Sequence, residues 1–185
     1  MNGFLARPGA EEKAARVRLF LTDVDGVLTD GGILYGSDGV ETKRFHVRDG
    51  HGLKMLQRCG VTVGIITGRT SEVVVIRARE LGIGIVRQGV FDKVRAWREI
   101  LGERGVRAEE TAYVGDDIVD LPLLRAVGFS AAPADAEPYV LDAVDFVSSR
   151  PGGAASVREI VEFLLRANGA WAGVTAKYFR PGETG

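Results

Sequence analysis

Several features that often suggest a function are missing from this 185-residue sequence. It has one cysteine, Cys59, so it cannot form an internal disulfide or a thiolate metal cage. No stretch approaches the roughly 18 apolar residues of a membrane span, and the N-terminal region lacks the apolar segment of a secretory signal. The formal net charge of -1 gives no reason to expect a nucleic-acid or membrane-surface partner. We therefore expect a cytoplasmic protein with neither kind of partner.

Two kinds of segment alternate through the middle of the chain. Short apolar runs rich in β-branched residues are each followed by a longer stretch with helical spacing. This alternation predicts parallel βαβ units, and runs that are apolar throughout fit strands covered on both faces. The predicted strands are 17–21, 61–66, 83–86 and 111–114, and the predicted helices are about 50–59, 71–81, 91–103 and 121–127. We predict a doubly wound parallel α/β sheet in a three-layer sandwich.

One segment, residues 31–47, interrupts this alternation. It holds two strand-like pieces around a Ser37-Asp38-Gly39 turn, which predicts a projecting β-hairpin. Its apolar side chains need a partner, either in their own domain or in another subunit. Further on, we expect a loop with a short helix at 131–143, a short strand at 146–148, a helix at 154–168 and an irregular tail at 169–185. The whole chain, 1–185, reads as one domain with its core at about 17–168.

Polar residues follow the predicted strands, at the point where each strand ends. In open parallel sheets ligands bind beyond the carboxyl ends of the strands, so we expect these side chains to gather at one rim. They are Asp23 and Asp25 after the first strand, Thr67 and Arg69 after the second, Asp92 and Lys93 after the third, and Asp116, Asp117 and Asp120 after the fourth. The concentration of carboxylates at this rim is the strongest functional signal in the sequence.

These residue types suit phosphoryl transfer. Several carboxylates would repel one another, and oxygen ligands favour a hard cation such as Mg²⁺. Lys93 and Thr67 provide a positive charge and a hydroxyl donor for phosphoryl oxygens. One carboxylate can accept the phosphoryl group, while another two residues on protonates the leaving oxygen and then activates water. We therefore predict a Mg²⁺-dependent phosphatase.

The ordered motifs DVDG (23–26), ITGR (66–69), DK (92–93) and GDDxxD (115–120) resemble those of the haloacid dehalogenase superfamily of phosphohydrolases. VDGVLTDGG followed by the hairpin and FHVRDGHGLKML extends the likeness to the 3-deoxy-D-manno-octulosonate 8-phosphate phosphatases, over nearly all of 17–168. The resemblance implies a HAD-like, Rossmann-type fold without a large cap, a Mg²⁺ cofactor and a homotetramer. It also implies hydrolysis of that sugar-acid phosphate to free sugar acid and phosphate in lipopolysaccharide biosynthesis.

The same resemblance implies roles for individual residues. Asp23 is the implied nucleophile, and Asp25 the general acid and base whose backbone carbonyl also binds Mg²⁺. Asp116 is the implied third protein ligand of the metal, and Thr67 and Lys93 hold the phosphate. Asp117 and Asp120 are expected to orient Lys93, to bind metal through water or to cap the next helix. The implied substrate contacts are Asp25, His46, Val47, Arg48, Asp49, Gly50, Lys54, Arg69, Arg77 and Lys93.

Two alternatives stay open at this point. Related phosphatases of nine-carbon 2-keto sugar acid 9-phosphates tend to carry glutamate where Arg69 stands. Arg69 therefore favours the eight-carbon substrate, because arginine can pair with a carboxylate or brace the residues that do. A phosphorylation-receiver signalling domain also places aspartate, threonine and lysine on such a rim. Its phosphorylated aspartate lies in mid-chain, so the motif order here argues against it.

Overall fold

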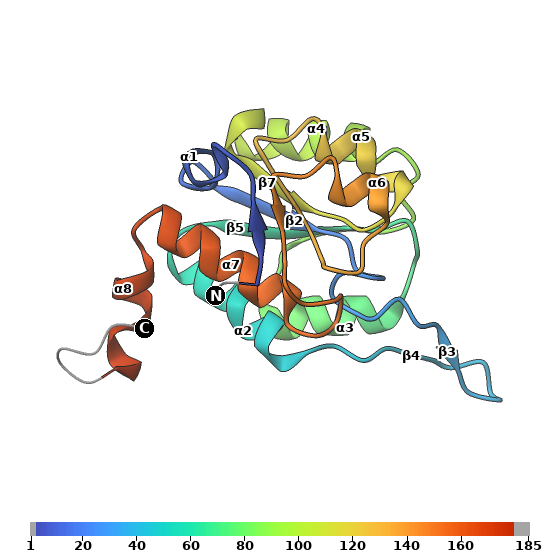
Figure 1. Cartoon of the computed structure of the whole chain (residues 1–185). Helices are drawn as coiled ribbons and strands as arrows, with labels where there is room; N and C mark the ends of the chain where they lie inside the picture. Colours follow the sequence, from blue (N-terminus) through green and yellow to red (C-terminus); the bar gives the residue numbers. More distant parts are fainter. Residues whose placement is uncertain (1–2, 180–185) are drawn as a thin grey trace.

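A seven-stranded sheet runs through the centre of the computed structural model, which describes residues 3–179 (Figure 1). The strand order is β1-β9-β8-β7-β2-β5-β6, and every neighbouring pair is parallel except β1 with β9. The strands are β1 (Leu5–Ala6), β2 (Leu19–Thr22), β5 (Thr62–Ile66), β6 (Ile85–Arg87), β7 (Thr111–Val114), β8 (Phe129–Ala132) and β9 (Phe146–Val147). The predicted doubly wound sheet is confirmed, whereas β1 and β8 were absent from the prediction.

Helices cover both faces of this sheet and complete the three layers. One core cluster joins the sheet to α1, α2, α3 and α7, and a second joins it to α4, α5 and α6. Alternation along β2 explains the division, since Phe20 belongs to the first cluster while Leu19 and Leu21 belong to the second. The helices are α1 (Ala10–Ala14), α2 (Val47–Arg58), α3 (Glu72–Leu81), α4 (Lys93–Arg104), α5 (Leu121–Leu124), α6 (Pro138–Leu141) and α7 (Ser156–Ala167), with single 3₁₀ turns η1 (Ala108–Glu110) and η2 (Ile118–Asp120).

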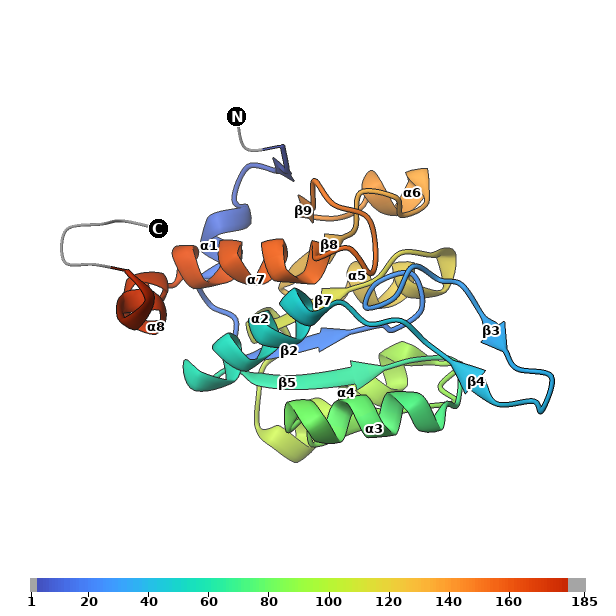
Figure 2. The ribbon, with the colours of Figure 1, turned by 90° about the horizontal axis from the view of Figure 1, so that it is seen from below.

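The predicted hairpin projects from the carboxyl end of the sheet, as Figure 2 shows. Its strands β3 (Leu34–Tyr35) and β4 (Glu41–Thr42) pair with Leu34 opposite Thr42 and Tyr35 opposite Glu41. The large apolar side chains around its tip are all exposed: Ile33, Leu34, Tyr35 and Val40. The hairpin therefore does not bury its apolar surface within the described chain.

The C-terminal part is more regular than predicted. Beyond α7 the chain forms a short helix α8 (Trp171–Thr175) and a 3₁₀ turn η3 (Ala176–Tyr178), in the segment expected to be irregular. The last part of that predicted tail, residues 180–185, lies outside the described residues. Across the part of the chain that is described, no helix combines the length and apolarity that a membrane crossing requires.

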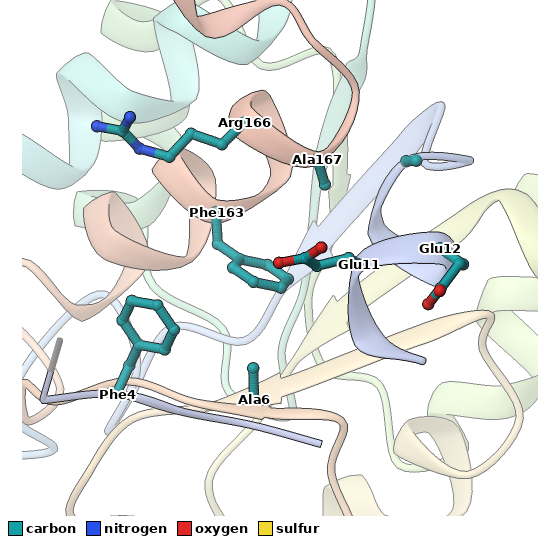
Figure 3. Close-up of a pocket in the computed structure, with 8 residues that line it drawn as sticks. Phe4, Ala6, Glu11, Glu12, Phe163, Arg166 and Ala167 are labelled. Atoms are coloured by element: carbon teal, nitrogen blue, oxygen red, sulfur yellow. The ribbon is translucent and has the colours of Figure 1, made fainter. Parts of the chain in front are cut away.

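A pocket of about 630 Å³ lies on the surface between β1, α1 and the end of α7 (Figure 3). Phe4 and Phe163 form its apolar side, and their ring centroids are 5.9 Å apart. Glu11, Glu12 and Arg166 supply its charged groups. None of the predicted site residues lines this pocket.

Candidate active site

Asp23 follows β2 directly and stands at the centre of the sheet. The backbone continues the strand pairing there, because Asp23 N donates to Val114 O at 2.9 Å. The next residues turn sharply, and Gly26 has a φ of 82°. A Cβ atom at Gly26 would lie 2.0 Å from Asp116 Oδ2, so only glycine lets the two loops approach so closely. The DVDG turn thus brings the carboxyl ends of β2 and β7 together.

Four buried polar side chains, which we call the inner cluster, meet beside this turn: Asp23, Lys93, Tyr113 and Asp120. Lys93 Nζ donates to Asp23 Oδ2 and to Asp120 Oδ1, each at 2.6 Å, and lies 3.1 Å from Tyr113 Oη. Tyr113 Oη in turn donates to Asp120 Oδ1. These contacts join the ends of β2 and β7 to the start of α4 and to η2.

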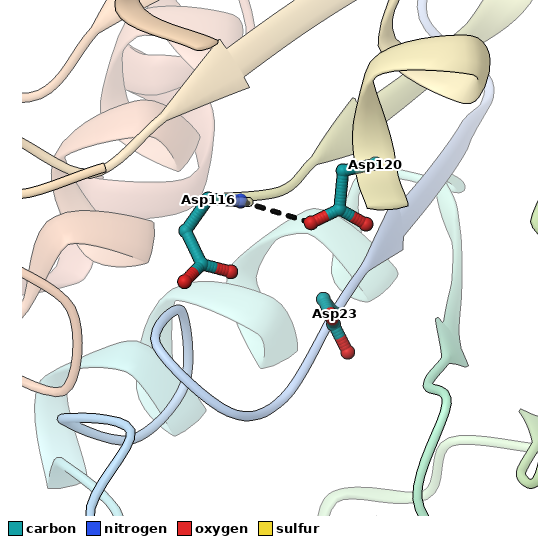
Figure 4. Close-up of side chains that lie close together, drawn as sticks. All are labelled: Asp23, Asp116 and Asp120. Carbon is teal, nitrogen blue, oxygen red and sulfur yellow. Dashed lines mark hydrogen bonds between the residues drawn. The ribbon is translucent and has the colours of Figure 1, made fainter. Parts of the chain in front are cut away.

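Asp120 is fully occupied by this arrangement. Its Oδ1 accepts from Lys93 and Tyr113. Its Oδ2 accepts from the backbone N–H of Asp116 at 3.1 Å, the bond drawn in Figure 4, and from that of Asp117 at 3.3 Å. The backbone can approach so closely because residue 115 is glycine, where a Cβ would lie 2.5 Å from Asp120 Cγ. With four donors on two oxygens, Asp120 has no lone pair left for a metal. It orients Lys93, one of the roles expected for it.

The protonation states follow from burial and charge. Burial alone would lower the pKa of Lys93, but the carboxylates of Asp23 and Asp120 outweigh it and raise this pKa above its ordinary value. Burial and the nearby carboxylates hold the pKa of Tyr113 well above its usual range, so the phenol remains a neutral donor. Lys93 is therefore a fixed positive charge beside Asp23.

Asp116 supplies a further carboxylate that has no cationic partner within residues 3–179. Ligand atoms of Asp23, Asp116 and Asp120 lie within 4.8 Å of one another, and Figure 4 shows the three side chains facing the same space. Burial, and then repulsion from Asp120 and Asp23, raises the pKa of Asp116 to about 7. A hard divalent cation would relieve this repulsion, and oxygen donors suit it. Since Asp120 is occupied, Asp23 and Asp116 are the side chains that fit such an ion.

Asp25 belongs to a second group of charges, which we call the outer cluster: Asp25, Glu41, Lys43 and Arg69. Lys43 Nζ hydrogen-bonds to Asp25 Oδ1 and lies 3.5 Å from Glu41 Oε1. Arg69 Nε lies 3.5 Å from Asp25 Oδ2, and Arg69 Nη2 donates to Glu41 Oε1 at 3.0 Å. Arg69 thus braces the hairpin here, and its predicted contribution to binding the substrate carboxylate stays a prediction.

Sequence reasoning missed Glu41 and Lys43. Both come from the returning part of the hairpin, which was interpreted only as a projection. They stand two residues apart in extended chain, so their side chains share one face. A Glu-x-Lys pair on one face of a strand, close after a DxD motif, was the signal that could have identified them.

Thr67 and Asp117 both lie at strand ends, as predicted. Thr67 follows β5 and is buried, and its hydroxyl makes no hydrogen bond to any residue from 3 to 179. It is therefore free to donate to a ligand. Asp117 caps η2, because its Oδ1 accepts from Ile118 N at 2.6 Å; it also accepts from Tyr139 Oη at 3.1 Å. Capping was among the roles expected for Asp117.

The predicted substrate contacts at 46–50 form the start of α2, and the structure gives two of them a packing role. Asp49 is 1% exposed, and its Oδ1 accepts from Arg158 N at 2.7 Å. It thereby caps α7, whose own N-cap residue, Ala155, has no side-chain acceptor. Gly50 is buried under Arg77, whose Nη2 would lie 2.4 Å from a Cβ there. Asp49 and Gly50 thus also serve packing, and their predicted contacts with the substrate stay predictions.

The remaining predicted substrate contacts on or next to α2 and α3 are at least partly accessible, but the structure does not bond them to either cluster. His46 Nδ1 accepts from Arg48 N at 3.2 Å and so caps α2. Val47 and Arg48 are exposed, and Lys54 is half-buried. Arg77 Nη1 donates to Glu80 at 3.1 Å, and its guanidinium lies 5.7 Å from the centroid of the Phe45 ring. Their predicted roles stay predictions.

Comparison with known proteins agrees with this geometry. The family model for haloacid dehalogenase-like hydrolases matches residues 70–152. The 3-deoxy-D-manno-octulosonate 8-phosphate phosphatase of Haemophilus influenzae is 44% identical over 86% of this chain and 88% of its own length.

Solved structures give the same result. The crystal structure of the Yersinia pestis 3-deoxy-D-manno-octulosonate 8-phosphate phosphatase superposes with a TM-score of 0.88 at 40% identity, over 90% of each chain. That of the Moraxella catarrhalis enzyme, in complex with a magnesium ion, a phosphate ion and a KDO molecule, has a TM-score of 0.90 at 38% identity, over 92% of this chain and 98% of its own. With this coverage and identity, the chain belongs to the 3-deoxy-D-manno-octulosonate 8-phosphate phosphatase family of haloacid dehalogenase-like hydrolases.

Proposed function

We propose that this protein is a Mg²⁺-dependent phosphatase that hydrolyses 3-deoxy-D-manno-octulosonate 8-phosphate, as part of lipopolysaccharide biosynthesis. One observation carries the chemistry: Asp23 lies 2.6 Å from a buried lysine that Asp120 holds in place, and Asp116 stands beside it with a pKa raised to about 7. A nucleophile, a fixed cation and a carboxylate suited to a metal are thus assembled at one rim. The substrate is inferred from the names of the relatives.

The reaction needs two steps at this rim. In the first, an oxygen of Asp23 attacks phosphorus, the bond from phosphorus to the sugar oxygen breaks, and Asp25 gives its proton to that oxygen. In the second, Asp25 takes a proton from water, which attacks the aspartyl-phosphate and regenerates Asp23. Lys93 and the Thr67 hydroxyl hold the phosphoryl oxygens throughout.

Mg²⁺ would be held by the carboxylates of Asp23 and Asp116, together with the backbone carbonyl of Asp25. When bound, it neutralises charge on the transferring phosphoryl group and on the carboxylates around it. The inner cluster explains why a cation is needed there: Lys93 already serves Asp23 and Asp120, so Asp116 has no cation of its own.

Arg69 supports the eight-carbon substrate over a nine-carbon one. Its Nε is buried and makes no hydrogen bond to the described residues, although it lies 3.5 Å from Asp25 Oδ2. Its Nη2 is bound to Glu41 and to Tyr35 Oη. A glutamate in place of Arg69 would put a third carboxylate beside Asp25 and Glu41, and the three would repel one another. The outer cluster therefore requires a cation at position 69, unlike the nine-carbon phosphatases that tend to carry glutamate there.

Phosphate release over a panel of sugar phosphates tests this function. We expect the eight-carbon sugar-acid phosphate to give the highest kcat/KM, by at least about tenfold over the nine-carbon 9-phosphate, and expect activity to disappear with a chelator and return with Mg²⁺. A preference for the nine-carbon compound would refute the substrate assignment. Absence of Mg²⁺-dependent phosphate release from every compound would refute the phosphatase itself. A phosphoaspartate that persisted for minutes without turnover would support the receiver alternative.

We also propose that the chain assembles as a homotetramer and acts in the cytoplasm. The exposed apolar hairpin supports assembly, because Ile33, Leu34, Tyr35 and Val40 are too close together to be ordinary isolated surface residues. Light scattering coupled to size exclusion should give four times the chain mass. Cell fractionation tests the location. A monomer at micromolar concentration would contradict the assembly, and recovery with membranes would contradict the location.

A further inference from the structure

Lys43 belongs to the projecting hairpin, yet its side chain is buried. That side chain is 1% exposed, whereas Leu34 and Tyr35 near the hairpin tip are exposed residues. The neighbouring residue, Arg44, points to solvent and pairs with the exposed Asp30 at 2.6 Å. Burying a lysine is costly unless a partner compensates its charge, so the position of this side chain calls for a specific partner.

That partner is Asp25, the proposed general acid and base. Lys43 Nζ hydrogen-bonds to Oδ1 of Asp25. The other oxygen, Oδ2, lies 3.5 Å from Arg69 Nε and receives no hydrogen bond from residues 3–179. One oxygen of this carboxylate is therefore held, and the other is left open.

The position of Lys43 is fixed in turn by Glu41. The Glu41 carboxylate lies 3.5 Å from Lys43 Nζ, accepts from Arg69 Nη2 at 3.0 Å and accepts from Ser71 Oγ, at the start of α3. The hydrogen bond from Ser71, with Arg69 and Lys43 nearby, lowers the pKa of Glu41, which therefore stays ionised. This connection ties the base of the hairpin to the segment between β5 and α3.

We propose that Lys43 is a positioning residue that fixes the orientation of the Asp25 carboxylate. By holding Oδ1, it leaves Oδ2 to give the proton to the leaving oxygen as the phosphorus–oxygen bond breaks, and later to take a proton from water. A carboxylate released from Lys43 could rotate about its side-chain torsions and present the proton less often in line. The inference rests on the proposed phosphatase function, and it assigns the hairpin a part in the chemistry of its own subunit.

Leaving-group dependence tests this proposal directly. Lys43→Met keeps the length of the side chain and removes its charge, and it should be assayed with phenyl phosphate and p-nitrophenyl phosphate. Neither compound carries the sugar acid, so a loss of substrate-carboxylate binding would not be mistaken for the effect. Phenol needs a proton as it leaves far more than p-nitrophenol does. We expect kcat/KM to fall about 10- to 100-fold for phenyl phosphate and less than about threefold for p-nitrophenyl phosphate, because a misplaced general acid loses part of its usual contribution of about 10²- to 10⁴-fold.

Two further variants complete the test. Arg44→Met, an exposed cation one residue away, should change neither value, and Lys43→Arg should recover part of the lost activity on phenyl phosphate. Activity of Lys43→Met on p-nitrophenyl phosphate also serves as evidence that it is folded. An equal loss on both compounds, or no loss on either, would overturn the proposal. If the wild-type enzyme released phosphate from no substrate, the proposed function would fail first and this inference with it.

Discussion

The inner and outer clusters use similar residue types but are built in different ways. The inner cluster sits on the ends of β2 and β7 and on the first turn of α4, and Asp23, Lys93 and Asp120 are 7%, 4% and 0% exposed. The outer cluster takes two members, Glu41 and Lys43, from a hairpin of two-residue strands whose tip is exposed. The packed sheet therefore fixes the positions of the inner-cluster side chains, whereas a small projecting hairpin fixes those of Glu41 and Lys43 in the outer cluster.

This difference separates two tasks in the proposed reaction. The bond to phosphorus forms at Asp23, where a misplacement of 1 Å would be costly, so the nucleophile belongs on the most rigid element. The proton moves at Asp25, which belongs to the DVDG turn and hydrogen-bonds to Lys43 of the hairpin. A hairpin can deliver charge to that point without disturbing the strand ends. Disrupting one cluster at a time should therefore give different kinetic results.

Replacement of the two aspartates should give the largest effects. Asp23→Asn removes the nucleophile, and we expect kcat/KM to fall on the order of 10⁴-fold or more on every substrate. Asp25→Asn leaves the nucleophile but removes the acid and base, for a loss of about 10²- to 10⁴-fold. With p-nitrophenyl phosphate, whose leaving group needs little protonation, this second variant should accumulate the phosphoenzyme. Mass spectrometry of acid-quenched protein would detect the added phosphoryl group.

The exposed Asp142 offers a matched control, because Asp142→Asn makes the same chemical change away from both clusters. It should retain wild-type activity. Phosphoenzyme in Asp23→Asn, or full activity in that variant, would show that the nucleophile is another residue. Absence of phosphoenzyme in Asp25→Asn with p-nitrophenyl phosphate would contradict the division of labour between the clusters.

The loss of unfolding free energy on substitution should also distinguish the two clusters, although these effects are smaller than those on activity. In Asp120→Asn one side-chain oxygen becomes an NH₂ group, so either Lys93 and Tyr113 or the two backbone N–H groups face a donor. Breaking a buried charged network of this kind costs about 3–5 kcal/mol. Glu41→Gln in the outer cluster should cost about 1 kcal/mol or less, since it is partly exposed. Urea unfolding in the absence of Mg²⁺ would measure both. Similar losses for the two variants would mean that the hairpin is as integral to the fold as the sheet.

The sequence pointed to three of the four inner-cluster residues, Asp23, Lys93 and Asp120, because they follow strands, whereas Tyr113 lies within β7 and was missed. In a parallel sheet the ends of neighbouring strands must meet, so these three residues, together with Thr67 and Asp116, could be brought to one rim without knowledge of side-chain geometry. The four strands and the hairpin could likewise be predicted, from the apolar runs and the turn residues. β8 was missed because its Phe-Ser-Ala-Ala sequence carries few β-branched residues.

The outer cluster and the start of α2 were harder to predict. Which way Lys43 points depends on how the hairpin lies over the rim, which no local pattern specifies. The family resemblance implied a substrate contact for Asp49, and nothing in the sequence indicated that it also caps α7, more than 100 residues away in sequence. Long-range capping of this kind depends on helix packing, which the sequence of either helix alone does not reveal.

Metal binding should show a smaller, pH-dependent effect that comes from Asp116, beside the inner cluster, and not from the outer cluster. The pKa of Asp116 is raised to about 7 in the metal-free fold, so below that pH Mg²⁺ must displace a proton. We expect the apparent Kd for Mg²⁺ to rise up to about tenfold per pH unit below pH 7 and to level off above about pH 8.

The stability of the metal-free protein should also depend on pH: Mg²⁺ binds more tightly as the pH rises, whereas the metal-free fold becomes less stable. Because the pKa of Asp116 is higher in the folded chain than its ordinary value of 3.8, the folded state binds more protons than the unfolded state between those values. The free energy of unfolding should therefore fall as pH rises towards about 7, and added Mg²⁺ should restore it. Calorimetric titration with Mg²⁺ in buffers of different ionisation enthalpy would count the released protons: close to one at about pH 6 and none at about pH 8.

In Asp116→Asn both the proton release and this pH dependence should disappear, whereas Lys43→Met should keep them, because it alters only the outer cluster. A proton release that persisted in Asp116→Asn would place the titrating group elsewhere on the rim.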